Sequence, residues 1–191
     1  MTFKYPRDLR PLMPDKATSL TIGMRKLWAD HVIWTREYIV AAVAGTPDAE
    51  AAAARLLRNQ EDIGNAIVPY YGRAAAGALT GLLRQHILIA VDLVAAAKGG
   101  NEAKFKEADA RWSKNVVEIA DLLSGANPHW PKKDLLDLLN LHLGLTKGEA
   151  VARLKKDWAA DVQAFDDIFT EINTVADALT AGIIQQFPGQ F

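Results

Sequence analysis

Residues 56–101, LLRNQEDIGNAIVPYYGRAAAGALTGLLRQHILIAVDLVAAAKGGN, decide the fold class of this chain. Apolar residues recur in this stretch at spacings of three and four, which is the period of an α-helix with one buried face. Pro69 disfavours a helical conformation in the residue before it, so Pro69–Gly72 predicts a turn between two helices. Gly99–Asn101 then ends the second helix and caps a third. The two helices joined by this short turn are therefore predicted to be antiparallel neighbours.

The same pattern continues on both sides of this stretch. It predicts a helix over 18–44, a second over 46–68, a third up to residue 98 and a fourth over 101–124. A short helix is expected over 132–143, and Thr146 and Glu149 have the spacing of a capping box that would begin the last helix, which ends near Gln186. A helix of that length would either kink, for which Gly182 is a candidate, or overhang the bundle and pack on the short helix. The sequence shows no internal repeat. It predicts an all-α, up-and-down, four-helix-type bundle with an extra short helix.

The composition is that of a folded globular protein. The chain has 191 residues, 22 basic and 23 acidic side chains, a net charge of −1 and no cysteine. This length suits one domain, which we place at 18–191 behind an irregular arm over 1–17. The lack of cysteine excludes disulfides, thiolate metal sites and cysteine nucleophiles. The balanced charge argues against nucleic acid as a partner.

No stretch of the sequence is an uninterrupted membrane span. The longest apolar run, over 87–97, contains Asp92 and is shorter than the ~18 residues that a span needs. The arm over 1–17 lacks the apolar segment of a secretory signal. We therefore expect no membrane partner and a cytoplasmic location, although a chain without cysteine also suits the periplasm.

One strongly polar residue interrupts the apolar face of each long predicted helix, near its middle. Counted from the turns, most of these residues fall at nearly the same height, within about 1.5–3 Å for neighbouring helices. We predict that they converge in a polar layer at mid-bundle, made of His31, Asn59, His86, Asn115 and Asp161.

Aromatic residues flank the predicted layer. Trp34, Trp112 and Trp158 each lie three positions from one of its members, as does Trp28 on the other side of His31, and residues three apart are neighbours on a helix surface. Tyr38 lies on the same face as His31. These side chains are expected to wall the layer.

Three hypotheses follow from such a layer. It could bind a ligand: either one divalent metal ion held by His31, His86 and Asp161, or a small polar organic molecule stacked on tryptophan. It could instead be a hydrogen-bond network that only fixes the register of the helices. It could finally be the general-base site of a hydrolase or isomerase with a His–Asp pair, although no nucleophile or phosphate loop accompanies it.

Two further features are predicted to be structural. His142 shares a face with Leu135 and Leu139, which indicates a half-buried packing residue, and His129 belongs to a loop. Phe187 and Phe191 follow the last helix and would pack on the core or on a second copy of the chain, as in a homo-oligomer.

Several strings resemble an uncharacterised family of bacterial helical-bundle proteins. They are LWADHVIWTR, RNQEDIGNAIVPYYG, ANPHW, HLGLTKGEA and the ending GIIQQFPGQF, so that the likeness extends from about residue 27 to the end. The resemblance implies a helical bundle of bacterial origin. Because that family has no established activity, it assigns no catalytic or binding residue.

Overall fold

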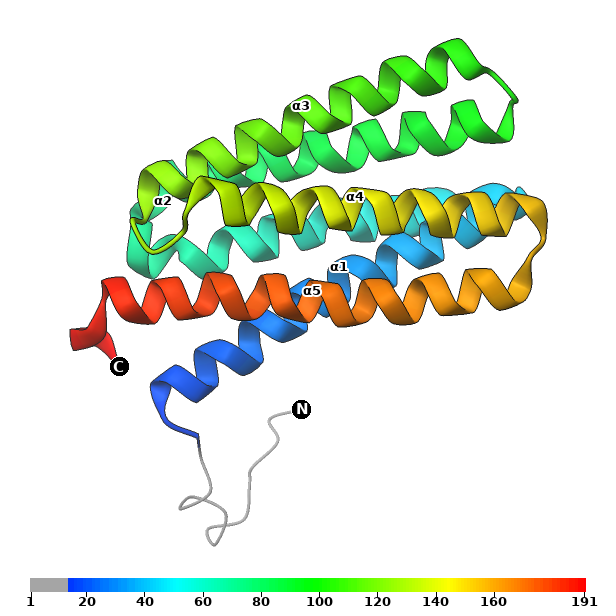
Figure 1. Cartoon of the computed structure of the whole chain (residues 1–191). Helices are drawn as coiled ribbons and strands as arrows, with labels where there is room; N and C mark the ends of the chain where they lie inside the picture. The colour runs from blue at the N-terminus through cyan, green and yellow to red at the C-terminus, as the bar shows by residue number, and fades with distance from the viewer. Residues whose placement is uncertain (1–13) are drawn as a thin grey trace, which may run out of the picture.

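The computed structural model describes residues 14–191, which form an all-α bundle, as predicted (Figure 1). Its helices are α1 (Lys16–Ala44), α2 (Ala49–Lys98), α3 (Glu102–Ala126), α4 (Lys132–Lys155) and α5 (Trp158–Gln186), followed by a short 3-10 turn at Pro188–Gln190. No strand occurs within the described residues. Asp15 caps α1 by accepting a hydrogen bond from the Thr18 amide, so the helix begins slightly earlier than expected. Most of the predicted arm over 1–17 lies outside the described residues.

Helix α2 folds back on itself at Gly72, the last residue of the predicted turn, whereas Pro69 stays within the helix. Gly72 has φ 75° and ψ 171°, a conformation that glycine adopts without steric cost, and it separates two helical halves, residues 49–71 and 73–98. Figure 1 shows the halves running in opposite directions. They approach closely near the turn, since a Cβ at Gly64 would lie 3.1 Å from the carbonyl oxygen of Ala76. The two antiparallel helices predicted here are therefore present.

The end of the chain departs from the prediction. The capping box at Thr146 and Glu149 is wrong, because α4 continues through both residues and the Thr146 hydroxyl donates to the carbonyl oxygen of His142, at 2.9 Å. The chain breaks instead at Lys156, which is left-handed (φ 59°), and Asp157 caps α5. In place of a short helix and a long one, α4 has 24 residues and α5 has 29, and α5 stays helical through Gly182.

The helical segments form three antiparallel hairpins. The first hairpin is α1 with residues 49–71, the second is residues 73–98 with α3, and the third is α4 with α5. Polar contacts close the ring between hairpins: Arg25 of α1 donates to Asp177 of α5 at 2.7 Å, and Lys147 of α4 to Asp109 of α3 at 2.7 Å. Each hairpin therefore packs against the other two.

The apolar core lies on both sides of a polar level. A larger cluster surrounds Trp28 and Trp112, and a smaller one contains Tyr38, Ile39 and Val94. Among the described helices, α2 alone is long and apolar enough to cross a membrane by length and composition. In this fold it is bent at Gly72 and both of its halves contribute residues to the core.

Candidate functional site

Three buried histidines meet between the two apolar clusters. The ring centroids of His31 and His86 are 6.4 Å apart, those of His31 and His142 are 5.5 Å apart, and those of His86 and His142 are 6.3 Å apart. Their exposed fractions are 2%, 5% and 5%. Each histidine comes from the first helix of a different hairpin. The layer is therefore a nearly equilateral triangle of imidazole rings.

Every ring is held by a side chain from the second helix of its own hairpin. The Nδ1 atom of His31 lies 3.2 Å from Gln60 Nε2, that of His86 lies 2.9 Å from Asn115 Oδ1, and that of His142 lies 3.0 Å from Glu171 Oε2. The sequence separation is 29 residues in all three pairs. The same histidine–partner contact is thus built three times.

The positions of these pairs reveal an internal repeat. The histidines stand at positions 31, 86 and 142, which are almost evenly spaced along the chain. A leucine stands four residues before each histidine, at Leu27, Leu82 and Leu138. The repeat is confined to a few positions, which is why the sequence pattern showed none.

The partners determine where the proton sits on each ring. Asn115 uses its amide nitrogen to donate to the Leu82 carbonyl oxygen, so its Oδ1 faces His86 and accepts from Nδ1–H. The Glu171 carboxylate likewise accepts from Nδ1–H of His142. A neutral ring that donates from Nδ1 keeps the lone pair on its Nε2 atom. Gln60 presents its NH₂ group, so Nδ1 of His31 accepts and Nε2 carries the hydrogen.

Two of the three rings, His31 and His86, favour the neutral form. Burial lowers the pKa of His31 well below its usual value, and the nearby rings of His142 and His86 lower it further. Burial and His142 also lower the pKa of His86, to about 3, against the opposing effect of its bond to Asn115. Neutral imidazole is the form that binds metal ions.

A small cavity of about 20 Å³ adjoins the three rings, and its lining also includes Thr35, Tyr38, Trp112 and Thr146. One water molecule needs roughly 10–15 Å³ by this kind of measure, so the cavity suits a single ion or a water molecule.

Four buried polar atoms next to the rings have no hydrogen-bond partner among the described residues. They are Trp28 Nε1, Trp112 Nε1, Gln60 Oε1 and Glu171 Oε1. Gln60 and Glu171 bond to histidines, while the indoles of Trp28 and Trp112 lie 5.7 Å from His31 and 5.0 Å from His86. Since most buried polar groups in proteins are paired, the cluster has hydrogen-bonding capacity that the protein itself does not use.

Most of the residues predicted for the layer do lie at it. Beside His31 and His86, Asn115 holds a ring, Trp112 and Tyr38 line the cavity, and Asn59 donates to the Leu27 carbonyl oxygen while accepting from Gln60.

Two of the predicted tryptophan walls lie elsewhere. Trp34 packs under the guanidinium of Arg55, and Trp158 is 54% exposed and packs under Arg153. Trp28, on the other side of His31, occupies the place expected for Trp34.

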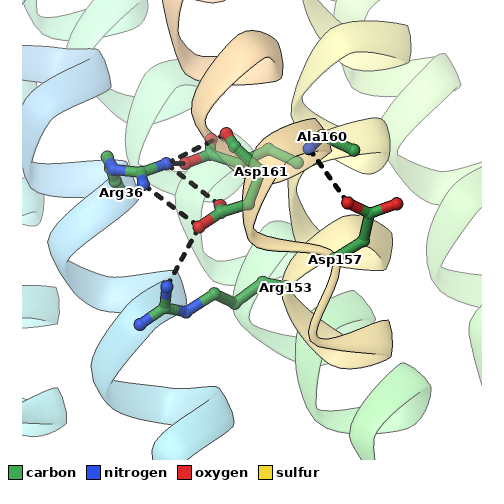
Figure 2. Close-up of polar contacts among 6 residues, drawn as sticks. Arg36, Arg153, Asp157, Ala160 and Asp161 are labelled. Carbon is green, nitrogen blue, oxygen red and sulfur yellow. Dashed lines mark hydrogen bonds and ion pairs between the residues drawn. The ribbon is translucent and has the colours of Figure 1, made fainter.

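Asp161 belongs to a separate ionic cluster, which is a correction to the predicted layer. Its carboxylate accepts hydrogen bonds from Arg36 at 3.1 Å and from Arg153 at 3.0 Å, so that it lies between two arginines (Figure 2). Arg36 also donates to Glu149, at 2.6 Å. Burial raises the pKa of Glu149 to about 7, in spite of the attraction of Arg36. The physical reason for the error is the helix break: α5 begins at Trp158, so Asp161 occupies its first turn rather than mid-bundle.

The predicted metal ligands are not assembled. Within residues 14–191, no group of three His, Asp or Glu side chains is arranged so that it could hold a metal ion as it stands, and His31, His86 and Asp161 form none. The carboxylate that does reach a histidine is Glu171, on His142.

Sequence reasoning missed His142, Gln60 and Glu171. His142 was interpreted as a packing residue because it shares a helix face with Leu135 and Leu139. The signal that identifies it is its place in the nearly even series of histidines after His31 and His86, each with a leucine four residues before it.

No family model, curated protein or solved structure matches the chain, which agrees with its resemblance to a family without an established activity.

Proposed function

We propose that the three-histidine cluster binds one divalent transition-metal ion through the Nε2 atoms of His31, His86 and His142. The observation that carries this proposal is the threefold anchoring: three buried rings adjoin one small cavity, and each has its Nδ1 atom engaged by a neighbouring side chain. His142 takes the place that the sequence suggested for Asp161.

The spacing of the rings is slightly wider than a bound ion requires. With metal–nitrogen bonds of about 2.0–2.1 Å, imidazole centroids around a tetrahedral ion are about 5–5.5 Å apart. The separation of His31 and His142 is already 5.5 Å, and the other two are 6.3 and 6.4 Å. His86 would therefore have to move inward by roughly 1 Å.

The size and chemistry of the site favour an ion over an organic ligand. Pockets for organic molecules measure about 300–1,000 Å³, far more than the 20 Å³ here. Imidazole ligands suit zinc, copper, iron and nickel ions, and a metal-binding histidine commonly donates its other N–H to a carboxylate or carbonyl oxygen. Glu171 and Asn115 accept from their histidines in that manner.

A purely structural role is the second candidate, and it is supported by the way the pairs connect helices. Each histidine–partner bond joins the two helices of one hairpin. In addition, His31 has an Nε2–H donor, and the neighbouring rings of His86 and His142 offer acceptor nitrogens. A layer of this kind could fix the helix register without any ion.

Metal titration of the chelator-treated protein separates the two candidates. We expect one Zn²⁺ or Co²⁺ per chain by isothermal titration calorimetry. Saturation to 100 times Kd would stabilise the fold by about 2.7 kcal/mol, which raises Tm by roughly 5–10 °C. His142→Asn should weaken binding by about 100-fold or more, whereas His129→Asn, in an exposed loop, should not change it.

Two results would leave the structural role in place: no saturable binding at millimolar metal, or equal losses in the His142 and His129 variants. Since His142→Asn leaves Glu171 buried without its partner, the double variant His142→Leu with Glu171→Leu provides a ligand-deleted protein whose fold contains no orphaned carboxylate.

A further inference from the structure

Resting on the proposed metal site, we infer that Gln60 is a positioning residue that decides whether His31 can join the ion. His86 and His142 have partners that leave Nε2 free to bind, and His31 does not. In the proposed site, His86 and His142 can bind the ion as they are, whereas His31 can bind it only after its ring hydrogen moves from Nε2 to Nδ1. The orientation of the Gln60 amide group decides between these two states of His31.

The amide nitrogen of Gln60 has more hydrogen-bond acceptors around it than it has hydrogens. Nε2 lies 2.8 Å from the Leu56 carbonyl oxygen, 3.2 Å from Asn59 Oδ1 and 3.2 Å from His31 Nδ1. An amide nitrogen has two hydrogens, so these three acceptors cannot all receive a full hydrogen bond. At least one of the two contacts at 3.2 Å, with Asn59 Oδ1 and with His31 Nδ1, is therefore less than a full hydrogen bond.

The same amide is unused at its oxygen. Gln60 is fully buried, and its Oε1 has no hydrogen-bond partner among the described residues. A buried acceptor without a partner costs roughly 1–3 kcal/mol. The arrangement seen here is consequently unfavourable at both ends of one group.

The other two hairpins show what a metal-ready partner looks like. Asn115 and Glu171 stand at the equivalent positions, 29 residues after their histidines, and both present an oxygen to Nδ1. Gln60 presents nitrogen instead. A ring that accepts at Nδ1 carries its hydrogen on Nε2, and a protonated nitrogen cannot ligate a metal.

Turning the Gln60 amide over would give the His31–Gln60 contact, in the first hairpin, the same form as the contacts in the other two hairpins. Gln60 Oε1 would then accept from Nδ1–H of His31, and the Nε2 atom of His31 would hold a lone pair for the ion. The ring stays neutral: one hydrogen leaves Nε2 and one is gained at Nδ1. The turn gives up the bonds to Leu56 and Asn59 and brings Oε1 toward their oxygen atoms, which repel it, so the turn lowers metal affinity relative to a site with three acceptor partners.

The variant that tests this inference is Gln60→Glu, because a carboxylate can only accept. Its matched control is Asn115→Asp, which adds the same negative charge beside a ring whose partner is already an acceptor. We expect Gln60→Glu to raise Co²⁺ affinity at least tenfold above Asn115→Asp and to intensify the visible Co²⁺ absorption of three-nitrogen coordination. Equal effects of the two variants would show that charge alone is responsible and would overturn the role of Gln60.

The failure of the metal site itself would look different, since neither wild type nor any variant would then bind Co²⁺ or Zn²⁺. Nitrogen NMR of the metal-free wild type keeps the inference testable if Gln60→Glu does not fold. We expect His31 to carry its hydrogen on Nε2 and the other two rings on Nδ1. A His31 ring protonated on Nδ1 would contradict the inference.

Discussion

The ring of His142 lies 5.5 Å from the ring of His31, the shortest separation in the cluster, although the two belong to the third and first hairpins. This contact makes the polar layer a junction between hairpins as well as within them. Substitutions at the layer and in the neighbouring ionic cluster should therefore separate its chemical role from its structural one.

Replacing one complete histidine–partner pair by leucine should be tolerated in the metal-free protein. For His86→Leu with Asn115→Leu, we expect stability equal to or above wild type in urea unfolding, because the buried polar pair is removed together. Asn115→Leu alone should cost about 1–3 kcal/mol, since it leaves the Nδ1–H of His86 unpaired. A loss of several kcal/mol in the double variant would show that this pair is essential to the fold itself.

The ionic cluster should be needed for stability and not for metal binding. Asp161→Asn removes the charge that faces both Arg36 and Arg153, and we expect a loss of about 2–3 kcal/mol, below the full cost of breaking a buried pair because both arginines are partly exposed. Its metal affinity should equal that of wild type. Asp166→Asn, exposed on the same helix, is the control and should alter neither. Reduced metal affinity in Asp161→Asn would restore this residue to the site.

Glu149 should make the protein more stable as the pH falls. Its pKa in the folded state, about 7, exceeds the ordinary value of 4.5, so the folded state binds the proton first. Stability should consequently be highest below about pH 4.5, fall as the pH rises from 4.5 to about 7, and level off above that. The charged groups facing it are Arg36, Arg153 and Asp161. Urea unfolding between pH 5 and pH 8 should show this slope in wild type, and a Glu149→Gln variant with the same slope would refute the assignment.

Gly182 should tolerate no side chain. A Cβ there would collide with the indole ring of Trp130, so Gly182→Ala is expected to destabilise the protein by about 1–3 kcal/mol. The matched variant is Gly144→Ala, also inside a helix but with open space around its Cβ, and it should stabilise by up to about 1 kcal/mol. Thermal unfolding measures both, and similar Tm changes in the two variants would contradict the packing at Trp130.

Local signals predicted the bundle well. Pro69 and Gly72 mark the fold-back of α2, and the interruptions of apolar faces at His31, His86 and Asn115 identify much of the polar layer. The capping box at Thr146 was misleading because the pattern of a helix start also fits a helix interior, where the threonine hydroxyl donates to the carbonyl four residues earlier and Glu149 bonds to a distant arginine. Because the position of Asp161 along the bundle was counted from this wrongly predicted helix start at Thr146, Asp161 was placed in the layer. The partners Gln60 and Glu171 depend on how helices are rotated against each other, which spacing within one helix does not determine.

The three-hairpin construction has a consequence for how the protein is assembled. The rings come from positions 31, 86 and 142, so no hairpin can form the cluster alone, and every contact between the rings joins distant parts of the sequence. Helices and their short-range hairpins form before contacts of such long range. We therefore expect the triangle of imidazoles to be completed late, when the last hairpin docks, so that its appearance would serve as a marker that the whole ring has closed.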